Sequence, residues 1–189
     1  MRVETTWERG GYVLRSSRAE DVDAYWEALD ALDPEGMRLT GSVPHAREEV
    51  VSFFLRCVDD SNRCDLLIIS PDGRVVGESV INEIDWVARS ANFRICLFDV
   101  ACRNHGIGSW ATCAARDLAF GRLGLHRLSL DVFSINPRAR RVYEKAGFVE
   151  EGVARDAVWL GSEEGYCDDV FMAILEDEWR ACGRVVVDG

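Results

Sequence analysis

The sequence has no long apolar run. Residues 1–17, MRVETTWERGGYVLRSS, contain no apolar core of signal-peptide length, and no later stretch approaches the roughly 18 apolar residues of a membrane-spanning helix. We therefore expect a cytoplasmic protein that does not act at a membrane.

Disulfide and metal-ligand patterns are also missing. The seven cysteines are odd in number, scattered and never arranged as C-x-x-C, so neither a disulfide framework nor a zinc site is predicted. The three histidines, His45, His105 and His126, lie far apart, which leaves a hydrolytic metal centre without support. We expect no metal, and we expect most of the cysteines to be small side chains of the core.

Basic residues are fewer than acidic ones. The chain has 22 Lys and Arg against 33 Asp and Glu, which gives a net charge of -11 at pH 7. Binding to a nucleic-acid backbone needs a basic surface, so no nucleic-acid partner is expected. The acidity suits a cationic substrate, but it is also explained by ordinary solubility, which is the commoner cause.

The amino-acid composition is typical of a globular protein. Apolar residues make up 48% of the chain and charged residues 29%, and 189 residues fit one domain, 1–189. We find no repeat, low-complexity run or linker.

The first half of the chain predicts strand, helix and helix, followed by a three-stranded meander. Ser17 with Glu20 predicts a capping box for a helix over 19–31, which the run 33–36, DPEG, is expected to break. Asp72-Gly73 predicts a hairpin turn. The other elements expected here are a strand at 12–16, a helix at 45–58, and antiparallel strands at 65–70, 74–86 and 92–100.

The second half predicts two more helices between strands. From Gly106 the apolar period becomes helical, and Gly124 closes that helix. Pro137 begins a second helix, which Gly147 ends. Strands are expected at 126–133, 148–160 and 166–175, with a short tail helix in EDEWRAC.

The stretch RNHGIGSW, residues 103–110, has two glycines at the start of the first of these helices. The first turn of a helix leaves backbone N–H groups without intrahelical partners and carries a partial positive charge. A phosphate can approach those nitrogens where glycine leaves the backbone bare. A Walker loop is absent, and Ala111 stands where the dinucleotide fingerprint needs its third glycine. By themselves the glycines also fit a tight turn into a helix.

Two motifs together resemble the GNAT superfamily of acyl-CoA N-acyltransferases. The first is Arg103-x-x-Gly106-x-Gly108 after LFDV, and the second, one helix and one strand later, is Asn136-Pro137 with RRVYEKAGF. The resemblance covers about 76–178. It implies the GNAT fold, an α/β (α+β) domain in which a mixed, mostly antiparallel twisted sheet is flanked by helices and a splayed strand pair holds acetyl-CoA.

The resemblance also implies how acetyl-CoA binds. Loop amides would cradle its pyrophosphate, and the pantetheine arm would pair with free backbone groups of Leu97, Phe98 and Val100. Asn136 is implied to hydrogen-bond the cofactor, although its place before Pro137 also suits a helix N-cap. The loop residues concerned are Arg103, which would add charge, with Asn104, His105, Gly106, Ile107, Gly108 and Ser109.

Two residues are implied in the chemistry. Tyr143 matches the tyrosine with which many members protonate the leaving CoA thiolate, although a half-buried aromatic would also suit that position. Glu83 matches an acidic residue on the acceptor side of polyamine-type members, and a solvated strand position is the alternative. Glu78 and Asp85 are further candidates, and strand alternation puts Glu83 and Asp85 on one face and Glu78 on the other.

The acceptor stays open between two branches of the superfamily. They are the spermidine acetyltransferases, which act on a small-molecule amine, and the ribosomal-protein acetyltransferases, which act on a protein N-terminus. NEIDWVARSANF resembles the polyamine enzymes, but Asn92 stands where they tend to carry an acid. Members of both branches assemble, so a homo-oligomer is one expectation.

Direct attack by a neutral amine is the expected mechanism, with strand amides stabilising the oxyanion. A covalent route through Cys102 or Cys96 would need a base that the sequence does not identify. A third alternative is a domain that binds CoA or acyl-CoA as a sensor and transfers nothing.

Overall fold

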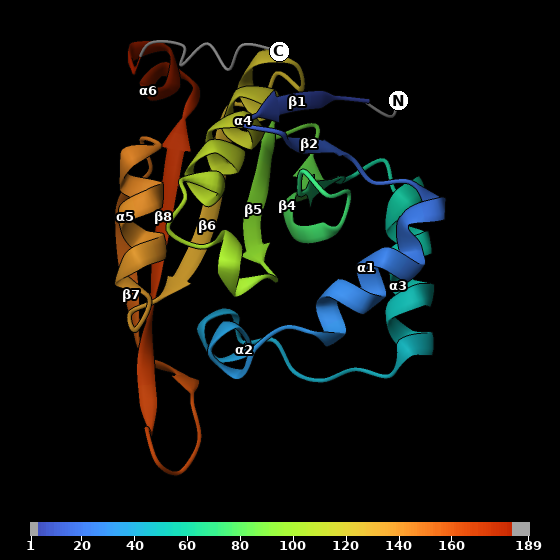
Figure 1. The fold of residues 1–189 in the computed structure, drawn as a ribbon. Coiled ribbons are helices and arrows are strands. Elements are labelled where there is room, and N and C mark those ends of the chain that lie inside the picture. Colours follow the sequence, from blue (N-terminus) through green and yellow to red (C-terminus); the bar gives the residue numbers. More distant parts are fainter. Residues whose placement is uncertain (1–3, 183–189) are drawn as a thin grey trace.

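One eight-stranded sheet runs through the protein in the strand order β1-β2-β3-β4-β5-β6-β8-β7 (Figure 1). The structure, a computed structural model, describes residues 4–182. The strands are β1 (Thr6–Arg9), β2 (Tyr12–Ser16), β3 (Cys64–Ile69), β4 (Val75–Asp85), β5 (Ser90–Leu97), β6 (Arg127–Phe133), β7 (Val149–Trp159) and β8 (Tyr166–Leu175).

Helices cover both faces of this sheet. The α-helices are α1 (Val22–Asp30), α2 (Pro34–Thr40), α3 (Arg47–Asp59), α4 (Ile107–Gly121), α5 (Pro137–Lys145) and α6 (Glu176–Ala181), and the short 3-10 helices are η1 (Ala19–Asp21) and η2 (Val100–Cys102). Within residues 4–182, no helix combines the length and the apolar character needed to cross a bilayer.

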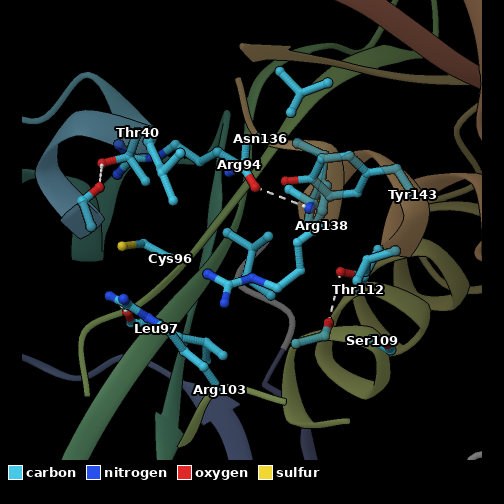
Figure 2. A pocket seen from close by; sticks show the side chains of 18 of the residues that line it. Thr40, Arg94, Cys96, Leu97, Arg103, Ser109, Thr112, Asn136, Arg138 and Tyr143 are labelled. Carbon is cyan, nitrogen blue, oxygen red and sulfur yellow. Dashed lines mark hydrogen bonds between the residues drawn. The ribbon is translucent and has the colours of Figure 1, made fainter. Parts of the chain in front are cut away.

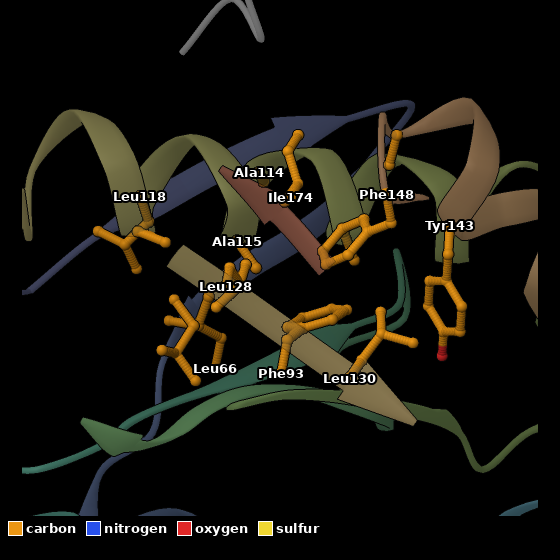
Figure 3. Packing of buried hydrophobic residues seen from close by; sticks show 14 of the residues in the cluster. Leu66, Phe93, Ala114, Ala115, Leu118, Leu128, Leu130, Tyr143, Phe148 and Ile174 are labelled. Carbon is orange, nitrogen blue, oxygen red and sulfur yellow. The ribbon is translucent and has the colours of Figure 1, made fainter. Parts of the chain in front are cut away.

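Two apolar clusters lie on opposite faces of the sheet. The larger one joins α4, α5 and α6 to the central strands, and Figure 3 shows Ala114, Ala115 and Leu118 of α4 packed over strand residues such as Phe93 and Leu128. The smaller one joins α1 and α3 to residues such as Leu67 and Phe98. Successive strand residues thus serve different clusters, as the period of two requires.

β5 and β6 form the one parallel pair in the sheet described, and they pair only briefly. Their register is Ser90 with Arg127, Ala91 with Leu128, and Asn92 with Ser129. Beyond these residues the strands part. All other neighbours are antiparallel, including the β3-β4-β5 meander, so the mixed, mostly antiparallel sheet with a splayed pair is confirmed.

Several local predictions needed correction. The N-cap before η1 and α1 is Arg18, one residue later than expected, and only half of a capping box forms there. The Asp21 carboxylate accepts from the Arg18 N–H at 2.7 Å, but the Arg18 side chain makes no cap hydrogen bond. The run 33–36 ends one helix and also begins another. The Asp33 carboxylate accepts from the Gly36 N–H at 3.0 Å, and Pro34 occupies the first position of α2. β1 was not predicted.

Candidate active site

A cavity of about 520 Å³ lies where β5 and β6 part. Its walls come from these two strands, from α2, and from the first turns of α4 and α5. In Figure 2, Arg103 and Ser109 stand at one end of the cavity and Asn136 and Tyr143 at the other. The predicted residues that line it are Leu97, Arg103, Asn104, Gly106, Gly108, Ser109, Asn136 and Tyr143.

The first turn of α4 is built to receive an anion. Its N-cap residue, Gly106, has φ of 76° and no side-chain cap, and Asn104 has φ of 66°. The Trp110 N–H closes the first intrahelical bond to the Gly106 carbonyl at 3.0 Å, so the N–H groups of residues 107–109 have no acceptor inside the helix. Alternating left-handed residues and uncapped amides are the features of an anion nest. A phosphate group is the kind of anion that such a turn can bind.

Arginines surround this loop. Arg9 of β1 donates from Nη1 to the Gly106 carbonyl at 3.1 Å. Arg138 extends from α5 into the cavity and has no ion-pair partner within residues 4–182 (Figure 2). Arg103 lines the cavity, but its guanidinium is buried and pairs with Asp33 and with the Leu97 carbonyl. Arg103 therefore links the start of α2 to the loop. Arg9 and Arg138 are the two arginines near the loop whose charge is not neutralised by a described carboxylate.

The strand edge facing the gap belongs to alternate residues of β5. The carbonyls of Arg89 and Ala91 point towards β6, where they accept from the His126 N–H at 2.6 Å and from the Ser129 hydroxyl at 3.1 Å. Backbone N–H and C=O groups of alternate residues point to the same side of a strand. Those of Phe93, Ile95 and Leu97 therefore face the gap between β5 and β6 as well.

Tyr143 lies on α5 at the far end of the cavity. Its ring is 7% exposed and meets Phe93 and Phe148 edge-on, with centroids 6.3 and 6.0 Å away. Its hydroxyl points into the cavity (Figure 2). Burial, followed by the charges of Asp131 and Cys96, raises the pKa of Tyr143 above its ordinary value. The phenol therefore holds its proton at neutral pH and can act as a donor.

The sheet face beyond Tyr143 carries charged side chains. Asp131 of β6 and Arg94 of β5 line the cavity there. Arg94 is held by Glu78, whose carboxylate accepts from the Tyr25 hydroxyl at 3.0 Å and pairs with Arg94 at 3.2 Å. Glu78 thus anchors Arg94, whereas the Asp131 carboxylate has no ion-pair partner among residues 4–182.

Other predicted residues lie outside the cavity. The Phe98 N–H is not free, because it donates to the Val76 carbonyl at 2.9 Å, and the Phe98 side chain is buried against α1. Val100 starts η2 and is 54% exposed. His105 is exposed to solvent, and Ile107 is a core residue beneath the loop.

Glu83 is not brought to Tyr143. The β4–β5 register shifts between Asn82 and Asp85, and Glu83 sits in this bulge with φ of 54° and an exposed side chain. The bulge also removes the simple alternation that was expected to relate Glu83, Asp85 and Glu78. The geometry gives Glu83 no contact with the cavity.

The cysteines named as alternative nucleophiles have no suitable base. Cys96 lines the cavity, but burial, then the charge of Glu78, raises the pKa of its thiol to about 12. Cys102 is buried, with its sulfur 3.7 Å from the Tyr12 hydroxyl. A thiolate at neutral pH is disfavoured at Cys96, so the covalent route loses support.

The sequence analysis did not identify two charged residues that line the cavity, Asp131 and Arg138, or Arg9, which contacts the loop beside it. Asp131 could have been found, because in HRLSLDVF it alternates with Leu128, Leu130 and Val132 and so must leave the core face. Arg138 follows Pro137 in a helix start, where a cation is unusual. Arg9 lies on the unpredicted strand β1, and only tertiary structure brings it to the loop.

A splayed strand pair, with an uncapped helix start at one end of the gap and a buried phenol at the other, is an arrangement that suits an acyltransferase. The family model described as acetyltransferase (GNAT) domain matches residues 12–149, and the chain belongs to this family. The resemblance drawn from the two motifs is thereby confirmed, as is the N-acetyltransferase class.

Named relatives share the family. The chain is 28% identical over 134 residues to spermidine N(1)-acetyltransferase of Vibrio cholerae, covering 70% of this chain and 75% of that one. The crystal structure of spermidine N-acetyltransferase from Vibrio cholerae in complex with CoA and spermine matches with a TM-score of 0.80 at 23% identity, covering 91% and 99%. The ribosomal-protein-S5-alanine acetyltransferase from Vibrio fischeri matches with a TM-score of 0.82 at 17% identity, covering 93% and 98%. The two structures show the fold alone.

Proposed function

We propose that this protein transfers the acetyl group of acetyl-CoA to a primary amine, and that the amine belongs to a polyamine such as spermidine. One observation carries the reaction: a single cavity joins the uncapped start of α4 to the buried hydroxyl of Tyr143. Such a cavity accommodates a ligand with a phosphate at one end and a reacting group at the other.

Each part of the cavity has a role in this proposal. The N–H groups of residues 107–109, with Arg9 and Arg138, bind the pyrophosphate. The edge of β5 at Ile95 and Leu97 binds the pantetheine arm. The Asn136 side chain caps α5 by accepting from the Ala139 N–H at 3.1 Å, and its amide NH₂ is left to donate to the cofactor.

The chemical step uses two side chains. Asp131 binds the incoming ammonium group and takes up its proton, directly or through water, because an amine attacks only in its neutral form. Tyr143 gives its proton to the sulfur of the leaving CoA. Two protons leave the nitrogen of the ammonium group in total. The one that Asp131 takes up before attack passes to solvent, and the one lost as the amide forms replaces the proton that Tyr143 has given to the CoA sulfur, so the reaction is balanced in protons.

Two features support a polyamine acceptor. The relative with 28% identity is named for spermidine, and spermine is present in the structure of a Vibrio cholerae enzyme with the same fold. The acceptor side carries Asp131, and the chain has a net charge of -11, both of which attract a polycation.

The test is thiol release from acetyl-CoA with spermidine, spermine or short peptides bearing free N-termini. We expect release with the polyamines. Tyr143→Phe should lower kcat by about 10²- to 10⁴-fold, the usual contribution of a general acid, and leave the Kd for acetyl-CoA nearly unchanged.

The other outcomes separate the alternatives. Release with peptides alone would favour a protein N-terminus as acceptor. Acetyl-CoA binding without release for any amine would favour a CoA sensor. Full turnover by Tyr143→Phe would remove this residue from the mechanism.

A further inference from the structure

Asp169 of β8 is a carboxylate without a counter-ion. Its Oδ1 atom is buried and accepts no hydrogen bond from any described residue. Burial, and then the charge of Asp131, raises the pKa of Asp169, although a hydrogen bond from the Val170 backbone opposes the rise. A buried oxygen with unused lone pairs beside a second carboxylate is costly unless a cation is present.

The register of β6 and β8 explains how the two carboxylates meet. Asp131 is opposite Phe171, and Phe133 is opposite Asp169. All four side chains leave the same face of the sheet, because Val132 and Val170 between them point into the core. The two carboxylates therefore occupy the diagonal of a square whose other corners are aromatic, about 7–8 Å apart.

This square continues the cavity. Asp131 and Phe133 line it, and Asp169 is the next residue across the sheet. Phe171 is 46% exposed on the same face. A path thus leads from the hydroxyl of Tyr143, past Asp131 and the two phenylalanines, to Asp169.

We propose that Asp169 binds the second ammonium group of a diamine or polyamine whose reacting amine lies at Asp131. The inference rests on the proposed amine acetyltransferase function. The reacting amine gives up its proton, but the second amine stays charged and needs a permanent anion. The methylene groups between the two nitrogens lie over Phe133 and Phe171, whose faces also attract a cation.

This arrangement selects between acceptor classes. A monoamine of equal length fills the same path but leaves Asp169 unpaired, and a peptide N-terminus brings no second cation at a fixed spacing. Asp169 is therefore a specificity residue and takes no part in proton transfer.

The test compares putrescine and spermidine with butylamine as acceptors, using steady-state kinetics at saturating acetyl-CoA. Asp169→Asn keeps the shape of the side chain and removes its charge. We expect its KM for putrescine and spermidine to rise by about 10- to 100-fold, with a much smaller change in kcat, and its KM for butylamine to rise by no more than about threefold. Asp169→Glu should recover part of the selectivity.

Asp59→Asn is the matched control, because it removes one exposed carboxylate near the end of α3, outside the cavity. It should keep the wild-type ratio of diamine to monoamine kcat/KM. An equal loss for all three amines in Asp169→Asn, or none, would overturn the subsite while leaving the acetyltransferase function intact. If the wild-type protein transferred acetyl groups to none of the amines, both the subsite and the acetyltransferase function would be overturned.

Discussion

Glu78 is a buried carboxylate with both oxygens in use. It accepts from Tyr25 of α1 and pairs with Arg94 of β5, so it links a helix of the smaller cluster to the wall of the cavity. The Tyr25 ring is fixed in turn against Phe54 and Phe98, with centroids 4.7 and 5.8 Å away.

We expect Glu78→Ala to lower the free energy of unfolding by about 2–3 kcal/mol. This is less than the full cost of unpairing a buried charge, because Arg94 is partly exposed. Tyr25→Phe removes one donor and should cost about 1–2 kcal/mol. Urea unfolding of both variants measures the difference, and equal losses would show that the ion pair adds nothing beyond the tyrosine hydroxyl.

Asp21 stabilises the protein in a pH-dependent way. Burial would raise the pKa of its carboxyl, but the Arg15 guanidinium, bound at 2.7 Å through both oxygens, and the Arg18 N–H lower it below the ordinary value. A lowered pKa in the folded state means that the stabilisation is present above the unfolded pKa, about 3.9, and is lost as the pH falls through the folded value.

Asp21→Asn should therefore be less stable than wild type by about 1–2 kcal/mol at pH 7. Chemical unfolding followed from pH 7 down to about pH 3 should show the two proteins converging below about pH 4. A constant gap over this range would mean that the ion pair is not the source of the difference.

At the scale of elements, the start of α4 is the feature on which the proposed binding of acetyl-CoA depends. A Cβ atom added at Gly108 would meet only Leu97 Cδ1, at 3.7 Å, so a side chain there disturbs little of the fold. It would project at the proposed pyrophosphate position.

Gly108→Asp and Gly108→Asn differ in charge and hardly in shape. The aspartate variant should bind CoA at least about tenfold more weakly than the asparagine variant, because its charge repels the phosphates. It should also melt at an equal or higher temperature, since a carboxylate suits a helix N-terminus. Calorimetric titration and thermal melts give the two values, and equal affinities would contradict an anion site at this turn.

Sequence patterns located most elements but not all of their contacts. The helices after Gly106 and Pro137 were predicted because an apolar period of 3.6 and strong start and stop residues agree there. α2 was missed because Asp33-Pro34 was interpreted only as the end of a helix, although the same pair is a typical N-cap with proline at the first position.

Some residues of the candidate site could be predicted from local motifs, and others could not. Gly106, Gly108 and Tyr143 lie in motifs with local spacing, so their place in the cavity could be predicted from the chain alone. Glu83 was expected from its match to an acidic residue of polyamine-type members, and strand alternation was used to assign its face. The one-residue bulge at this position changes that alternation. Pairings that join distant segments, such as Arg103 with Asp33, leave no periodic signal.

At the scale of the whole molecule, the net charge of -11 creates a field that concentrates cations near the protein. Raising the ionic strength from about 0.01 M to about 0.15 M shortens the Debye length from about 30 to about 8 Å. The kcat/KM for spermidine, a trication, should fall more steeply over this range than that for butylamine. Initial-rate measurements in both buffers check this, and parallel declines would show that the field does not steer the acceptor.

The brief pairing of β5 with β6 makes the sheet incomplete in its centre. Backbone groups of Ile95 and Leu97 face an opening where a continuous sheet would supply a neighbouring strand, and of these the Leu97 carbonyl accepts from the Arg103 guanidinium. If the acyl donor binds there as proposed, it would take the place of a missing strand, and its binding free energy would add to the free energy of unfolding. The cellular supply of that donor would set the lifetime of the enzyme as well as its rate, so starvation for acetyl groups would expose the same protein to unfolding and degradation.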